Sequence, residues 1–204
     1  MASHISKIAL LTVGASGIGV GGYGVYHFSA LGDTIGDKLK AKYKNSNIVF
    51  LNPEHKEWSN LIGWYSKVKN KPKKSNDATL ALDEVKSWCT SSLNHQFKSE
   101  DDDLYRQVEE LCWLNVNTLL EESGKESLRS SQNADHNDWK VVWKSYQQDS
   151  QKESKGIKID DSVLNGTDEV AGGKAMHKWC NESFSKKMYS DKTLLPAFKA
   201  WCVN

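Results

Sequence analysis

The stretch WCTSSL at 88–93 decides the fold, because a similar stretch, WCNESF, recurs at 179–184. A Trp and a Tyr seven residues apart precede each stretch, as Trp58 with Tyr65 and as Trp139 with Tyr146. A second Cys follows each stretch at nearly the same distance. These matches in type and order predict an internal duplication, with repeat unit 1 at 52–122, a linker at 123–136 and repeat unit 2 at 137–204.

Each repeat unit is predicted to contain three helices, so the expected fold class is all-α. Apolar residues recur at the spacing of one helix face in each of them. In unit 1 the three faces are Trp58, Leu61, Ile62 and Tyr65; Leu82, Val85, Cys89 and Leu93; and Leu104, Val108, Leu111, Cys112 and Leu119. In unit 2 they are Trp139, Val142, Trp143 and Tyr146; Ala175, Met176, Trp179, Cys180 and Phe184; and Leu195, Phe198, Trp201 and Cys202.

Capping residues and polar stretches mark the expected ends of these helices. In unit 1 we expect starts at Asn52-Pro53, at Asp77 and at Ser99-x-x-Asp102. In unit 2 we expect starts at Asp168 and Asp191, with Pro196 in a first turn. The segment 70–76 is expected to be a solvated loop, and the polar insertion 151–166 is the expected mobile segment.

The four cysteines fall into two pairs. Cys89 and Cys112 lie at similar distances from the turn expected between them, and so do Cys180 and Cys202. Residues placed in this way meet at one level of an antiparallel helix pair. A disulfide in each unit is therefore one interpretation, and it would stabilise a module whose core alone is marginal. Two alternatives stay open, namely buried thiols and a zinc site that adds His177 to Cys180.

Residues 1–36 hold an apolar run, from Ile8 to Leu31, that contains no Asp, Glu, Lys or Arg. As a helix this run would be about 36 Å long, enough for a hydrocarbon core of about 30 Å. Gly17 and Gly21 have the spacing that permits close helix packing in a membrane. The run predicts an uncleaved transmembrane anchor. A cleaved signal peptide and a buried Gly-rich segment of a soluble domain are the alternatives.

Residues 37–51 are expected to join this anchor to repeat unit 1. Their lysines would hold the bulk of the chain in the cytoplasm under the positive-inside rule, whereas Lys7 favours the opposite orientation. The lysines concerned are Lys38, Lys40, Lys42 and Lys44. We expect the bulk of the chain to be extracellular, with a cytoplasm-facing arrangement as the alternative.

The apolar run also resembles the nucleotide-binding turn of short-chain dehydrogenases. The stretch GIGVGG at 17–22 fits a dinucleotide fingerprint, and Tyr65 with Lys69 mimics the catalytic pair of that family. The context argues against this interpretation, because the glycine spacing is one residue short and no acidic residue follows a second strand. Only 48–51 has the character of a strand, so an oxidoreductase is a remote alternative.

Composition supports no other functional class. The chain carries 27 basic and 26 acidic residues, and this balance provides no field that would attract nucleic acid. The six His are scattered, and the acidic run 100–103 suits a helix N-terminus. We therefore predict no catalytic residue, metal, cofactor or small-molecule substrate. Most Trp lie on the core faces, and Trp64, one position off a face, is the candidate for an aromatic ligand surface.

The Gly-rich N-terminal segment, Asn52-Pro53, Trp58, Tyr65 and the repeated Trp-Cys pairs together resemble a known kind of family. It is the large paralogous families of uncharacterised membrane-anchored proteins in haemotropic mycoplasmas. The resemblance implies a single membrane span and a variable domain displayed to the host, and it carries over no catalytic residues. We therefore expect a non-enzymatic, membrane-tethered protein for interaction or antigenic variation, with a host protein as the candidate partner. A cytoplasm-facing scaffold is the alternative.

Overall fold

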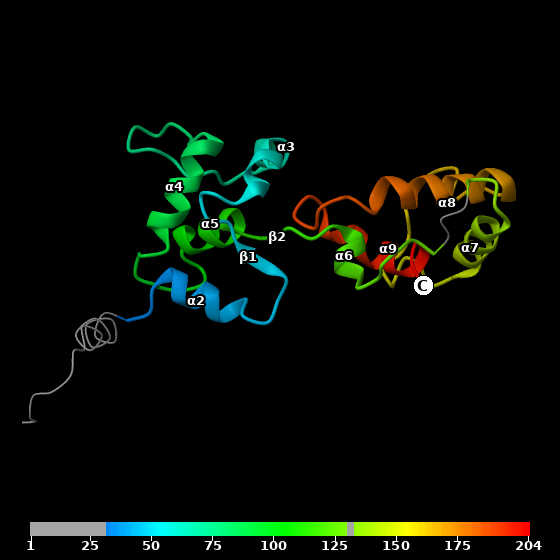
Figure 1. Cartoon of the computed structure of the whole chain (residues 1–204), viewed down its shortest axis with the longest axis horizontal. Coiled ribbons are helices and arrows are strands. Elements are labelled where there is room, and N and C mark those ends of the chain that lie inside the picture. Colours follow the sequence, from blue (N-terminus) through cyan, green and yellow to red (C-terminus); the bar gives the residue numbers. More distant parts are fainter. Residues whose placement is uncertain (1–31, 130–132) are drawn as a thin grey trace, which may run out of the picture. The chain divides into compact units, whose positions relative to one another are not determined.

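The computed structural model of the chain describes residues 32–129 and 133–204 (Figure 1). Most of the regular structure in these two ranges is helical, in agreement with the mainly helical prediction. No helix in them is long and apolar enough to cross a membrane. The predicted anchor and its packing residues Gly17 and Gly21 lie outside the described residues.

Two separate hydrophobic clusters divide the described chain into a first module, residues 34–116, and a second module, residues 117–204. The elements of the first module are α2 (Ile35–Lys42), β1 (Ile48–Phe50), η1 (Lys56–Asn60), α3 (Ile62–Lys67), α4 (Leu82–Ser92), α5 (Asp103–Cys112) and β2 (Trp113–Asn115). Those of the second are α6 (Leu119–Ser123), α7 (Asn137–Gln148), α8 (Glu169–Ser183), η2 (Lys192–Leu194) and α9 (Leu195–Trp201). β1 pairs antiparallel with β2, which confirms the strand character of 48–51.

Each module begins with a short helix that the apolar pattern did not reveal. α2 starts at a capping box of Thr34 and Asp37, and α6 starts at a capping box of Thr118 and Glu121. The backbone of each helix start then pairs with the loop that follows the Cys-bearing helix α4 or α8. The matching bonds are Ile35 N–H to His95 O (2.9 Å), Gly36 N–H to Leu93 O (3.0 Å), Leu119 N–H to Lys186 O (2.9 Å) and Leu120 N–H to Phe184 O (3.2 Å).

These two helices change the repeat boundaries. The segment 37–51 belongs to the first module, because Leu39 is fully buried in its core. Leu119, expected on the third helix of repeat unit 1, is buried in the second module instead. The first regular element of the first module is therefore capped at Thr34 and that of the second at Thr118, whereas the sequence placed the starts of the two units at 52 and 137.

Two further details of the first module were predicted wrongly. Ile62 is 74% exposed. The helix before it, η1, is a 3₁₀ helix with three residues per turn, so the spacing of an α-helical face is not kept across it. Asp77 does not cap α4. It occupies a turn with a positive φ of 62°, a conformation that Asp tolerates, and α4 is capped at Ala81.

The predicted starts in the second module are correct. Asp168 caps α8 and Asp191 caps η2, each through its carboxylate, and Pro196 lies in the first turn of α9. The polar insertion 151–166 is packed and not simply solvated, because Ile159 and Leu164 are buried in the core of the module.

Candidate functional site: a repeated framework around a disulfide

Each module contains one disulfide. It joins α4 to the end of α5 in the first module and α8 to the residue that follows α9 in the second. Cys89 is bonded to Cys112, with the Cα atoms 5.7 Å apart, and Cys180 is bonded to Cys202, with the Cα atoms 5.4 Å apart. All four residues are fully buried. The predicted pairing is confirmed, and the alternative interpretations as free thiols or as a zinc site at His177 are wrong.

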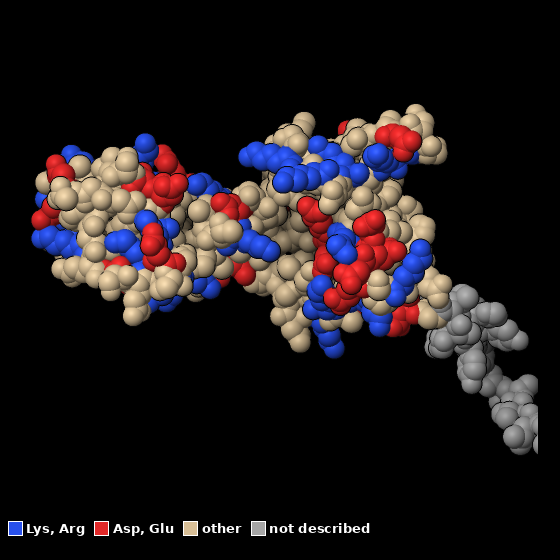
Figure 2. All heavy atoms as spheres, turned by 180° about the vertical axis from the view of Figure 1, so that it is seen from behind, with Lys and Arg blue, Asp and Glu red and all other residues tan. Residues whose placement is uncertain are grey.

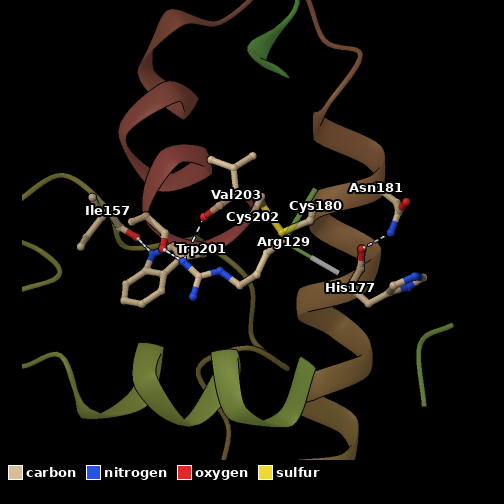
Figure 3. The surroundings of a disulfide bond; sticks show 9 residues. Arg129, Ile157, His177, Cys180, Asn181, Trp201, Cys202 and Val203 are labelled. Carbon is tan, nitrogen blue, oxygen red and sulfur yellow. Dashed lines mark hydrogen bonds between the residues drawn. A yellow bond between two sulfur atoms is a disulfide. The ribbon is translucent and has the colours of Figure 1, made fainter. Parts of the chain in front are cut away.

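The carbonyl of the second Cys anchors the chain that enters the next helix. In the first module Leu51 N–H donates to Cys112 O at 2.8 Å, and in the second Arg129 N–H donates to Cys202 O at 2.5 Å. The Arg129 guanidinium adds a bond to Val203 O at 3.0 Å, so the end of the chain is tied to the disulfide region (Figure 3). Each disulfide region therefore holds three chain segments together: the two that the disulfide joins and the one whose N–H bonds to the second Cys.

A seven-residue motif ends at Trp58 in the first module and at Trp139 in the second, and the apolar pattern of the sequence did not reveal it. Its pattern is Asn-x-(Glu/Asp)-His-x-(Glu/Asp)-Trp, at 52–58 and at 133–139. In both copies the Asn carboxamide oxygen accepts the N–H two residues later at 3.1 Å, which closes the turn. The signal was readable by aligning the two copies, but it lies in a turn with no apolar periodicity.

The His of this motif is the helix N-cap. His55 Nδ1 accepts Glu57 N–H at 3.2 Å, and His136 Nδ1 accepts Asp138 N–H at 3.3 Å. An N-cap acceptor satisfies a helix N–H that has no intrahelical partner. Two of the six His thus have a structural role that the scattered pattern did not suggest.

The Tyr seven residues after the Trp forms a matching hydrogen bond in each module. Tyr65 donates its hydroxyl to Leu80 O at 2.7 Å, and Tyr146 donates to Ile159 O at 3.2 Å. Both acceptors lie on the segment that leads to the Cys-bearing helix. Burial is the main cause that raises the pKa of both hydroxyls, so they remain donors at neutral pH. Disulfide, cap and Tyr bond therefore form one repeated set, which we call the framework.

An aromatic hollow of about 820 Å³ lies against the first module. Tyr43, Trp64, Trp113 and Tyr189 line it, and the rings of Trp64 and Tyr189 are 5.9 Å apart. Glu109 lines it as well and accepts the Tyr43 hydroxyl at 2.5 Å. Burial, followed by this bond, raises the Tyr43 pKa. Trp64, the candidate from the sequence, is thus half-buried at the rim of a cavity.

The described residues contain no group of three or more His, Cys, Asp or Glu that could hold a metal ion. The four sulfurs are bonded in two pairs, and the Nδ1 atoms of the two motif histidines accept backbone N–H groups. No protein-family model, curated protein or solved structure matches the chain.

Proposed function

We propose that this chain is a non-enzymatic binding protein, tethered to the cell membrane through its N-terminal segment and displayed outside the cell. The observation that carries the proposal is one disulfide in each module. Structural disulfides persist in oxidising compartments and are rare in the cytosol. An extracellular position of both modules accounts for two of them in one small chain.

The aromatic hollow supports a binding role. Trp and Tyr are the residues enriched at the centres of protein interfaces, because they supply a large apolar area together with one polar atom. The hollow carries four of them beside a carboxylate. A host protein is the partner that we propose for it.

We further propose that the modules arose by duplication of one ancestral unit. The matching caps, Tyr bonds, disulfides and helix-start bonds support common descent, because unrelated modules would have no reason to share all four. The proposed setting, a single span within residues 1–36 in a family like those of haemotropic mycoplasmas, rests on the apolar run from Ile8 to Leu31 and on the resemblance.

The test is labelling of intact cells with a membrane-impermeant maleimide. The wild-type chain has no free thiol for the reagent. In a Ser154→Cys variant an exposed side chain of the second module becomes the single target. We expect labelling of the variant in intact cells to equal labelling after lysis. Labelling only after lysis would contradict display outside the cell.

A cytoplasm-facing scaffold is the second candidate, favoured by the four lysines at 38–44. Part of that cluster serves the fold, because Lys42 pairs with Glu109 at 2.6 Å. This candidate predicts four reduced cysteines in native material. Thiol titration under denaturing, non-reducing conditions therefore separates the two, with no reactive thiols expected for the displayed protein and four for the scaffold.

A further inference from the structure

The loop between α3 and α4 carries an unusual density of positive charge. Five of the eight residues at 67–74 are lysines, and we call this segment the lysine loop. Its lysines are Lys67, Lys69, Lys71, Lys73 and Lys74. Figure 2 shows Lys and Arg side chains gathered along the upper edge of the first module, with Asp and Glu side chains below them.

The lysine loop is held in a defined shape. Pro72 is buried, and its carbonyl accepts Leu80 N–H at 2.9 Å. Lys73 forms a bridge with Thr79, and Lys74 N–H donates to Ala78 O at 2.8 Å. The backbone therefore returns on itself as a short hairpin, and the lysines on its first arm are presented without a large entropic cost of ordering.

In the part of the chain that the structure describes, three of the five lysines have neither a carboxylate nor an aromatic ring as a partner. Lys74 pairs with Glu84 at 2.5 Å, and Lys71 lies over the Tyr65 ring, 5.0 Å from its centroid. Among the described residues, no carboxylate lies within 4 Å of the ammonium group of the other three. These three are Lys67, Lys69 and Lys73.

The equivalent loop of the second module is neutralised. It also follows the helix with the framework Tyr, and it carries three lysines at 152–158. Lys155 pairs with Asp149 at 3.1 Å, and Lys158 pairs with Glu153. Unpaired positive charge is therefore a property of the first module's loop and not of the shared framework.

Two of these three lysines, Lys69 and Lys73, border a hollow of about 490 Å³ together with Lys71. Lys69, Lys71 and Lys73 line one wall. The other wall is formed by the α5 residues Asp103, Gln107 and Glu110, together with Arg106, whose guanidinium pairs with Asp101 at 2.9 Å. Lysine ammonium groups, carboxylates and one side-chain amide therefore line the same hollow.

This lining discriminates among polyanions. A single-stranded nucleic acid needs aromatic platforms for its bases, and no aromatic residue lines this hollow. A membrane surface is flat and cannot enter a concave site that also contains two carboxylates. A sulfated polysaccharide satisfies both walls, because its sulfates pair with ammonium groups and its hydroxyls donate to carboxylates and amides.

We propose that the lysine loop and the facing side of α5 bind a linear sulfated polysaccharide. This inference deepens the proposed function by naming a class of ligand, and it rests on that function for access to extracellular polymers. Two walls of different chemistry give the site selectivity for a sulfated sugar over a polyanion without hydroxyl donors.

The experiment measures binding of the full chain to a heparin octasaccharide. The competitors are hyaluronan of equal length, anionic phosphatidylserine vesicles and an oligo(dT) strand. We expect the heparin fragment to bind most tightly. The double variant Lys69→Gln/Lys73→Gln is expected to lose about 30-fold in affinity, on the basis of about 1 kcal/mol for each lysine near an anionic surface.

The matched control is Lys155→Gln/Lys158→Gln, which removes the same charge from the equivalent loop of the second module and is expected to bind within about twofold of wild type. An equal loss in both variants, or tighter binding of vesicles or oligo(dT), overturns the proposal. Thermal unfolding of each variant verifies that it is folded. Heparin binding by a chain that proves to be cytoplasmic would contradict the proposed function and leave the site intact.

Discussion

The two modules share a framework and differ in how the space inside it is filled. At the position four residues after the framework Trp, the first module has Ile62, which is 74% exposed, and the second has Trp143, which is 6% exposed. At the position eight residues before the first Cys, the first module has Ala81 and the second has Gly172. A Cβ on Gly172 would lie 2.2 Å from the ring of Trp143.

The framework therefore tolerates paired changes of the side chains that pack inside it. A Trp packs inward only where the facing helix has no side chain, and the copy without the inward Trp has no need of the glycine. The indole N–H of the framework Trp also differs between the modules. Trp58 Nε1 donates to Asn52 O at 2.7 Å, whereas Trp139 Nε1 is buried with no partner among the described residues.

The largest test of this comparison removes each disulfide in turn. Replacing both Cys89 and Cys112 by Ala, or both Cys180 and Cys202, is expected to lower the free energy of unfolding by about 3 kcal/mol, because each bond closes a loop of similar length. Chemical denaturation followed by Trp fluorescence measures this. A loss confined to one pair would show that the modules do not depend on the framework equally.

The second test adds a methyl group to the packing in the second module. Gly172→Ala is expected to destabilise the protein by about 2 kcal/mol, because the rigid indole of Trp143 cannot move aside. Combining it with Trp143→Ile should recover part of the loss. Gly63→Ala is the control, since its Cβ would meet nothing within 4 Å, and a small gain in helix stability is expected there. Equal effects at both glycines would refute the packing account.

The third test compares the two Tyr hydroxyls. Tyr146→Phe should cost about 2 kcal/mol, because this hydroxyl also contacts Asn165 Oδ1 at 2.6 Å and accepts Ile159 N–H at 3.3 Å. Tyr65→Phe, which loses only the bond to Leu80 O, should cost about 1 kcal/mol. The measurement is the denaturation midpoint at an unchanged slope. The reverse order would show that the insertion 151–166 does not depend on Tyr146.

The smallest effect concerns the capping boxes. The side-chain bond with Thr34 is the main cause that lowers the pKa of Asp37, and the bond from the Thr118 backbone N–H is the main cause for Glu121. A carboxyl with a lower pKa in the folded state stabilises above its unfolded pKa of about 4, and this stabilisation is lost as the pH falls through the folded value. Glu121→Gln keeps the cap without titrating, so the stability of this variant should vary less between pH 5 and pH 2. A slope identical to wild type would exclude a contribution from this carboxylate.

The disulfides and the helices α7, α8 and α9 of the second module could be predicted from the sequence, because their apolar residues recur at helical spacing and Cys180 and Cys202 lie on faces that flank one turn. The first module was harder to predict because η1 is a 3₁₀ helix, so Ile62 does not lie on the expected apolar face. α2 and α6 were not predicted, because each is short and is held by backbone hydrogen bonds to residues about 60 positions away. Such bonds leave no periodic pattern in the sequence. The caps at His55 and His136 were visible only as a repeated motif.

Each disulfide has a mechanical consequence. Because the crosslinks lie within the modules and not between them, a pull on the two ends of the chain cannot straighten the 22 residues between Cys89 and Cys112 or the 21 residues between Cys180 and Cys202. Each enclosed loop would otherwise add about 75 Å of extended chain. Under a pulling force the enclosed residues therefore add to the length of the chain only after a reductant has cut their disulfide.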